Sequence, residues 1–227
     1  DVLAALEFLR AQEHVDPARI YLGGHSTGGT LALLVAEATD RFRAVFSFGP
    51  VDDPAGYGQE QLPYDANDAR EARVRAPVHF LAAVRSPTFV IEGEGGNIES
   101  LRDLERASEN PALRFLPVKN ADHFDVLGPA NALIARKLAA STDGAVDLPA
   151  GELQAAFDEQ RAAAREADDL ESIAQLRRQG VSLDATVRAQ HHLLSREKSA
   201  LEAAARGARA AGFEPSPIET RADDEGD

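Results

Sequence analysis

One stretch of the sequence constrains the fold more than any other, because it has the composition of a tight turn between a strand and a helix. Residues 19–24 form a short apolar run that ends in Gly23 and Gly24, Ser26 follows after His25, and residues 27–38 have strong helical propensity. Gly24 and Gly28 flank the serine two positions away on each side, which is the G-x-S-x-G spacing. A turn this tight strains the serine backbone and leaves no room for side chains beside it. The pattern predicts a nucleophile elbow that presents the Ser26 hydroxyl.

The same stretch could instead be a glycine-rich loop without any chemistry, because G-x-S-x-G often occurs by chance. The strand before it and the helix after it favour the elbow. In an elbow the helix points its first N–H groups toward the serine, so the Thr27 N–H is predicted to donate to a developing oxyanion.

Helices alternate with short apolar strands over the first 140 residues, which predicts the α/β class with a parallel sheet. Residues 49–70 are rich in Gly, Pro, Asp and Asn, and we expect a loop there that forms part of a substrate rim. The expected helices cover residues 1–13, 27–39, 76–84, 98–108 and 125–139, and the expected strands cover 19–23, 43–48, 87–93 and 113–118.

The elbow stretch, together with the strands and helices after it, resembles the α/β-hydrolase superfamily over residues 1–140. Within that superfamily it looks most like the serine hydrolases akin to prolyl oligopeptidases and acyl-peptide hydrolases. The resemblance implies a partial α/β-hydrolase fold, with helices on both faces of a parallel sheet. It also implies a serine hydrolase that cleaves an ester or peptide bond through an acyl-enzyme on Ser26.

The resemblance also implies that parts of the catalytic domain lie outside this sequence. The chain opens at Asp1, without a methionine and already in an expected helix, so we expect a fragment of a longer protein that lacks the N-terminal half of the domain. The second oxyanion donor is expected in an earlier loop, often H-G-G in this family. Loss of one donor typically costs about 10²–10³ in rate, so the fragment itself is expected to be weakly active or inactive.

His123 is the candidate base that would take the proton of the serine hydroxyl. The superfamily supplies this histidine from the loop after the last strand, and His123 has a strand before it, a helix after it, and Ser26 far upstream. The alternative is a solvated loop histidine. The other histidines fit less well. His14 and His79 lie in or near expected helices, His191 and His192 lie in the tail, and His25 lies inside the elbow itself.

The sequence leaves the catalytic acid open. The family pattern would place an aspartate about three residues after Gly93, but that residue is Gly96, and Asn97 follows. Glu94 is the nearest carboxylate in the loop and is the first candidate, since the imidazole needs a buried anion to fix its tautomer. Asp53, after the second strand, is the second candidate, although it also fits a turn or a helix cap. The third possibility is that no functional acid is present.

Composition changes after residue 140. Residues 141–151 have the composition of a linker, 152–179 are predicted to form one long helix, and the acidic end 221–227 is predicted to be disordered. Residues 152–220 weakly resemble the regulator of ribonuclease E activity B, which implies a small α+β domain. The residues that carry this likeness are Leu176–Gly180, Asp184, His191–Leu193 and Gly212–Glu214.

Composition also excludes several function classes. A net charge of −14 disfavours binding to nucleic acid or to an anionic membrane. No run of about 18 apolar residues occurs, so no membrane span is predicted. Cysteine is absent, which excludes disulfides and thiolate metal sites, and we predict no metal and no cofactor. We predict a cytoplasmic protein that acts on a small-molecule or peptide substrate.

Two hypotheses from different classes remain open at this point. The first is the serine hydrolase described above, with Ser26 and His123 in the positions that the superfamily requires. The second is a catalytically degenerate hydrolase scaffold whose tail binds a protein partner, as a ribonuclease regulator would. The missing acid at Gly96 and the likeness of the tail motivate this second hypothesis.

Overall fold

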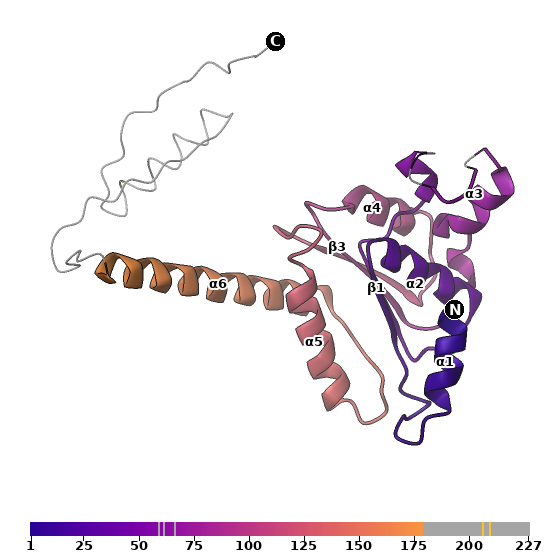
Figure 1. Ribbon diagram of the computed structural model, residues 1–227, viewed down its shortest axis with the longest axis horizontal. Coiled ribbons are helices and arrows are strands. Elements are labelled where there is room, and N and C mark those ends of the chain that lie inside the picture. Colours follow the sequence, from indigo (N-terminus) through magenta and orange to yellow (C-terminus); the bar gives the residue numbers. More distant parts are fainter. Residues whose placement is uncertain (59, 61, 66, 179–205, 207–208, 210–227) are drawn as a thin grey trace, which may run out of the picture. The chain divides into compact units, whose positions relative to one another are not determined.

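The computed structural model describes residues 1–58, 60, 62–65, 67–178, 206 and 209 of the 227-residue chain. The chain divides into two compact units, Asp1–Leu170 and Glu171–Asp227. All the strands that the structure describes belong to the first unit, and so does the candidate site. Figure 1 shows this unit as a sheet with helices packed on it.

Four parallel strands form one sheet in the order β1-β2-β3-β4, which confirms the predicted α/β class. All the residues of β2 and β3 are buried, as expected for parallel strands that are covered on both faces. The strands are β1 (Leu22–His25), β2 (Val45–Phe48), β3 (Thr88–Gly93) and β4 (Leu113–Val118).

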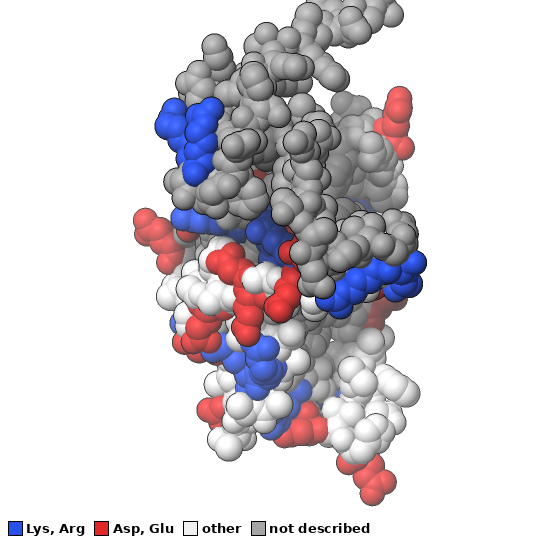
Figure 2. Space-filling model, turned by 90° about the vertical axis from the view of Figure 1, so that its left-hand side faces the viewer, with Lys and Arg blue, Asp and Glu red and all other residues white. Residues whose placement is uncertain are grey.

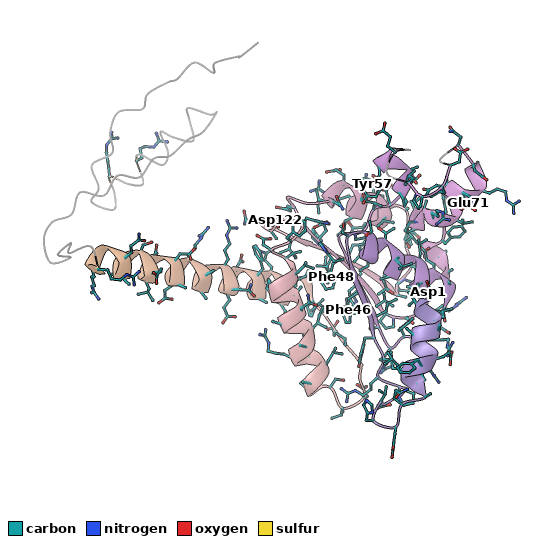
Figure 3. All side chains as sticks on the ribbon, viewed as in Figure 1. Asp1, Phe46, Phe48, Tyr57, Glu71 and Asp122 are labelled. Carbon is teal, nitrogen blue, oxygen red and sulfur yellow. The ribbon has the colours of Figure 1, made fainter. Side chains whose placement is uncertain are left out.

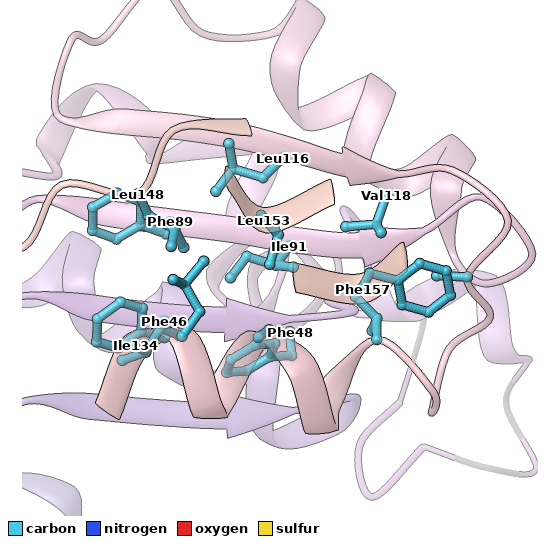
Figure 4. Packing of buried hydrophobic residues seen from close by; sticks show 14 of the residues in the cluster. Phe46, Phe48, Phe89, Ile91, Leu116, Val118, Ile134, Leu148, Leu153 and Phe157 are labelled. Carbon is cyan, nitrogen blue, oxygen red and sulfur yellow. The ribbon is translucent and has the colours of Figure 1, made fainter. Parts of the chain in front are cut away.

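Alternate side chains of the strands build two hydrophobic layers, because successive residues in a strand point to opposite faces. On one face, shown in Figure 4, the sheet packs against α5 (Leu127–Ala140) and the beginning of α6 (Ala150–Arg178). On the other face it packs against α1 (Val2–Arg10), α2 (Thr27–Ala38) and α4 (Ile98–Arg106). The prediction that helices cover both faces is therefore confirmed.

One predicted helix is wrong. In place of a helix over residues 76–84, the structure has α3 (Ala69–Arg75), followed by two 3₁₀ turns at Pro77–His79 and Leu81–Ala83. Pro77 disfavours helical backbone at the residue before it, and Ala76 is accordingly extended, with φ −98° and ψ 105°. The region before Pro77 forms the helix instead.

The segment after α5 packs against the first unit, although the composition of residues 141–151 is typical of a linker. Leu148 is fully buried, the Tyr21 hydroxyl donates to the Gly144 carbonyl at 2.7 Å, and Arg114 pairs with Asp147. Leu153 and Phe157 of α6 lie in the same core, so the first unit extends to Leu170 rather than to residue 140.

α6 agrees with the long helix expected over residues 152–179. The remainder of the α+β domain expected over 152–220, and the acidic end, lie outside the described residues except for 206 and 209. None of the described helices has the length and apolar character needed to cross a bilayer. On the face drawn in Figure 2, acidic and basic side chains of the described residues are interspersed.

Candidate active site

Ser26 lies in a sharp turn between β1 and α2. Its backbone has φ 58° and ψ −120°, and a positive φ is strained for any residue except glycine. Hydrogen bonds hold this conformation on both sides, since the Ser26 N–H donates to the Phe48 carbonyl at 2.8 Å and the Ser26 carbonyl accepts from the Thr30 N–H at 3.0 Å. The strained turn expected of a nucleophile elbow is therefore present.

The glycines around Ser26 have different roles. A Cβ on Gly24 would lie 2.1 Å from the Gly28 carbonyl oxygen, so only glycine fits at position 24. A Cβ on Gly28 would meet no atom within 4 Å, so the expectation that Gly28 is also needed to avoid a collision is wrong. The second crowded position is Gly29, whose Cβ would lie 2.3 Å from the Phe48 carbonyl oxygen, because this residue of α2 faces the sheet.

The register of the sheet places three site positions in a row. His25 pairs with Phe48, and Phe48 pairs with Ile91, so the residues that follow them, Ser26, Gly49 and Glu92, lie level with one another. Neighbouring strands are about 4.8 Å apart, which separates the backbones at Ser26 and Glu92 by about 10 Å, with Gly49 between them.

The imidazole of His123 contacts Glu92. His123 Nδ1 lies 2.9 Å from Glu92 Oε2, and the Glu92 side chain is fully buried while that of His123 is 18% exposed. The Glu92 carboxylate also accepts hydrogen bonds from the Gly93 N–H at 2.7 Å and from the Asn97 N–H at 3.0 Å. An acceptor in this position requires the proton on Nδ1, so Nε2 of His123 is left free to accept a proton.

Gly49 provides the space for this imidazole. Its φ is +56°, and a Cβ there would lie 2.4 Å from Cε1 of His123 and 2.7 Å from Oε2 of Glu92. The Asn97 side-chain amide donates to the Gly49 carbonyl at 3.1 Å and holds this turn beside Glu92. Among the described residues the hydrogen bond of the His123 ring goes to Glu92, and none joins it to Ser26 Oγ. In enzymes without substrate, such a contact is often long and tightens when the substrate binds.

Neither sequence-predicted acid contacts His123. Glu94 is exposed, and its backbone N–H donates to the Val118 carbonyl. Asp53 caps the 3₁₀ turn Pro54–Tyr57 by accepting from the Ala55 N–H at 2.9 Å, which is the cap alternative considered above. The carboxylate beside His123 is instead Glu92.

The sequence did carry a signal for Glu92. It is the one charged residue in β3 (Thr88–Gly93), an otherwise apolar buried strand, and a buried carboxylate is rare unless it is paired. Position 96, where the family pattern expects the acid, is related to it in space. A Cβ on Gly96 would lie 2.5 Å from Glu92 Oε1, so the Glu92 carboxylate occupies the space next to Gly96.

Two further groups lie next to Ser26 and His123 in the chain. Thr27 is the first residue of α2, so its backbone N–H has no acceptor within the helix. Asp122 Oδ1 accepts from the Asp125 N–H at 2.8 Å and the Phe124 N–H at 2.7 Å, which fixes the turn around His123. These two backbone hydrogen bonds, led by that from Asp125, lower the pKa of the Asp122 carboxyl. In Figure 3, Phe46 and Phe48 mark the direction of β2 (Val45–Phe48), and Asp122 lies beyond the end of the strand at Phe48.

Comparison of the sequence with protein families finds a match for only part of the chain. Residues 1–95 match the prolyl oligopeptidase family, a segment that contains Ser26 and Glu92 but ends before His123. No curated protein matches the chain.

Solved structures share the fold. An acylaminoacyl peptidase from Pyrococcus horikoshii is 15% identical with a TM-score of 0.52, over 67% of this chain and 28% of that one. Dipeptidyl peptidase 4 from Porphyromonas gingivalis is 19% identical with a TM-score of 0.50, over 60% of this chain and 21% of that one. An acylaminoacyl peptidase in complex with a chloromethyl ketone is 14% identical with a TM-score of 0.50, over 65% and 28%. The chain spans less than a third of the length of each of these proteins, and at these identities the likeness concerns the fold.

Proposed function

We propose that this chain carries the nucleophile, base and acid of a serine hydrolase that cleaves an ester or peptide bond. The observation that carries the proposal is the hydrogen bond between His123 and the buried Glu92. The imidazole lies against Gly49, and Gly49 stands between Ser26 and Glu92 in the row of strand ends. A nucleophile, a base and an orienting carboxylate in this order along the chain form the arrangement that activates a serine.

In the proposed acylation step, Ser26 Oγ attacks the carbonyl carbon of the substrate while His123 Nε2 takes the hydroxyl proton. The carbonyl oxygen becomes an oxyanion and accepts a hydrogen bond from the Thr27 N–H. Glu92 keeps the proton of His123 on Nδ1 and stabilises the imidazolium that forms.

Acylation is complete when the carbon–nitrogen or carbon–oxygen bond of the substrate breaks and His123 gives its proton to the leaving amine or alcohol. Water then attacks the acyl-enzyme, with His123 Nε2 taking a proton from the water and returning it to Ser26 Oγ. The products are a carboxylic acid and an amine or alcohol, and the enzyme is restored.

The family match on residues 1–95 supports this proposal, because that segment contains the elbow and Glu92. The position of Glu92 also removes one motive for the degenerate-scaffold hypothesis. That motive was the lack of an acid at Gly96, and the carboxylate of Glu92 lies beside this position and contacts His123.

A fluorophosphonate probe tests the proposal, because it reacts covalently with an activated serine and requires no knowledge of the substrate. The full-length protein is incubated with excess probe, and the modified residue is located by mass spectrometry. We expect modification of Ser26 that is lost in Ser26→Ala and strongly slowed in His123→Ala.

Ser141→Ala serves as the matched control, since Ser141 lies at the end of α5 and its hydroxyl bonds Asp143. This variant should be labelled at the wild-type rate. Labelling that persists in Ser26→Ala, or that is insensitive to His123→Ala, would overturn the proposal.

A further inference from the structure

We propose that His25, the residue between Gly24 and Ser26, is a positioning residue that holds the His123 loop against the elbow. This inference rests on the proposed function. Sequence reasoning considered His25 only as a base and set it aside, because it cannot reach the neighbouring hydroxyl well. The structure gives it a different contact, since His25 Nε2 lies 2.9 Å from the backbone carbonyl oxygen of His123.

The chemistry of this contact assigns the proton. A carbonyl oxygen only accepts hydrogen bonds, so His25 Nε2 carries the hydrogen and donates it. His25 is the last residue of β1, where it pairs with Phe48 in the sheet. The donor is therefore attached to the same strand end that presents Ser26, and the acceptor belongs to the backbone of the proposed base.

The other hydrogen bonds of this loop come from α6 and from the far side of the site. Arg161 of α6 donates to the Asn120 carbonyl at 2.8 Å. The Gly95 N–H donates to the Ala121 carbonyl at 2.9 Å, and the His123 ring bonds Glu92 at 2.9 Å. Both of these partners belong to β3 or to the turn after it. Among the described residues, His25 makes the hydrogen bond that ties the loop to the elbow side. Without it, no hydrogen bond among the described residues would join the loop to the strand end that presents Ser26.

The ring of His25 also packs against the loop. Its centroid lies 4.4 Å from that of His123, at an interplanar angle of 41°, and 5.4 Å from that of Phe124 in an edge-on arrangement. His25 thus offers two separable features, a hydrogen-bond donor and an aromatic ring. A structural role in packing would require the ring, whereas positioning of the His123 backbone requires the donor.

Two substitutions separate these features. His25→Phe keeps a ring of similar size but removes the donor, and His25→Gln removes the ring but keeps an N–H near the position of Nε2. His79→Phe is the matched control, because it makes the same change in a 3₁₀ turn away from the site. The rate of Ser26 modification by the fluorophosphonate probe is measured for each full-length variant, together with its thermal unfolding.

We expect His25→Phe to slow the modification about 10- to 100-fold, since a misplaced base commonly has an effect of this size, with a melting temperature close to that of the wild type. His25→Gln is expected to restore the rate to within about 3-fold of the wild type, and His79→Phe to leave it unchanged. A wild-type rate in His25→Phe, or equal losses in His25→Phe and His25→Gln, would overturn the positioning role.

A second measurement keeps this inference distinct from the proposed function. Hydrogen exchange of the amides in residues 121–126 reports on the loop whether or not Ser26 reacts. We expect exchange to become about 10-fold faster in His25→Phe but not in His25→Gln, and unchanged exchange in His25→Phe would contradict the inference. If Ser26 of the wild type does not react with the probe, the proposed function is overturned, but the hydrogen-exchange result still tests the contact of His25 with the loop.

Discussion

The carboxyl ends of β1 and β3 lie at the same edge of the sheet, but they hold the proposed catalytic side chains in different ways. At Ser26 the backbone itself is strained, and hydrogen bonds of the main chain fix its direction. At Glu92 the backbone continues an ordinary strand, and two N–H donors and an imidazole hold the carboxylate. The serine is placed by chain geometry, whereas the acid is placed by contacts of its own side chain.

This difference predicts which property each region loses on substitution. A side chain added at Gly24, two residues before Ser26, collides with backbone, so it should affect the free energy of unfolding. A change at Glu92 alters the charge beside His123, so it should affect the chemistry first. The predictions below test this division, beginning with the largest expected effect.

Glu92→Gln should slow the modification of Ser26 by about 10³-fold or more, because an amide in this position no longer enforces the Nδ1–H tautomer of the base. The change keeps the size of the side chain, so the fold should persist. The rate with the fluorophosphonate probe is the measurement, and Glu94→Gln is the matched control, because Glu94 is exposed two residues away. A larger loss in Glu94→Gln than in Glu92→Gln would return the role of the acid to Glu94.

Gly24→Ala should destabilise the chain by about 3 kcal/mol, because its Cβ would lie 2.1 Å from the Gly28 carbonyl and backbone must move to admit it. Gly28→Ala is the matched control. Its Cβ meets nothing within 4 Å, and alanine in a helix is favoured over glycine by about 1 kcal/mol. Urea denaturation of the two variants measures both values. Equal destabilisation by the two substitutions would show that the elbow needs both glycines for the same reason.

The contrast between these two strand ends also explains how much of the site could be predicted from the sequence. The strained turn at Ser26 was predictable because it requires a small residue at a fixed spacing from the serine. The sequence has Gly24 at that spacing, two residues before Ser26. β4 was predicted with the same bounds that the structure has, Leu113–Val118, since its mostly apolar run follows a proline and ends at the polar Lys119 and Asn120. His123 was predictable as a loop residue by chain order alone.

Glu92 could not be placed in the same way, because nothing in its local sequence requires its contact with His123. That contact depends on the register of β3 against β4, which leads into the His123 loop, and on the space left by Gly49 and Gly96, which are tertiary features. The role of residues 141–149 was hidden for a similar reason. Val146 and Leu148 are isolated apolar residues in a mostly polar segment, and only the packed core shows that Leu148 is buried and that Val146 packs against the same cluster.

Gly96→Ala tests whether the space around the acid matters as much as its charge. The added Cβ would lie 2.5 Å from Glu92 Oε1 and should displace the carboxylate from His123. We expect a 10- to 100-fold slower modification of Ser26, equivalent to about 1.4–2.7 kcal/mol. If the effect acts through Glu92, it should largely vanish when Glu92 is already Gln, which a double-mutant cycle measures. Additive losses would show that Gly96 acts by another route.

The smallest expected effect concerns a second glutamate, Glu37 on α2, which lacks the partners that Glu92 has. Both of its side-chain oxygens are buried without a hydrogen-bond partner among the described residues, and this burial raises its pKa from 4.5 to about 8. A carboxyl that binds its proton more tightly in the folded state stabilises the protein at low pH and loses that contribution as the pH rises through the folded pKa. The contribution of Glu37 to stability should therefore fall between about pH 4.5 and pH 8.

Glu37→Gln removes this titration, so its stability relative to the wild type should rise over the same interval, by about 1–2 kcal/mol after allowance for partial exposure. Urea denaturation at several pH values measures this difference, and Glu105→Gln on the exposed side of α4 is the control. A difference between Glu37→Gln and the wild type that does not change with pH would mean that Glu37 is as well satisfied as Glu92. In that case burial would not distinguish Glu92 from Glu37. The two glutamates would differ only in the hydrogen bonds that Glu92 makes.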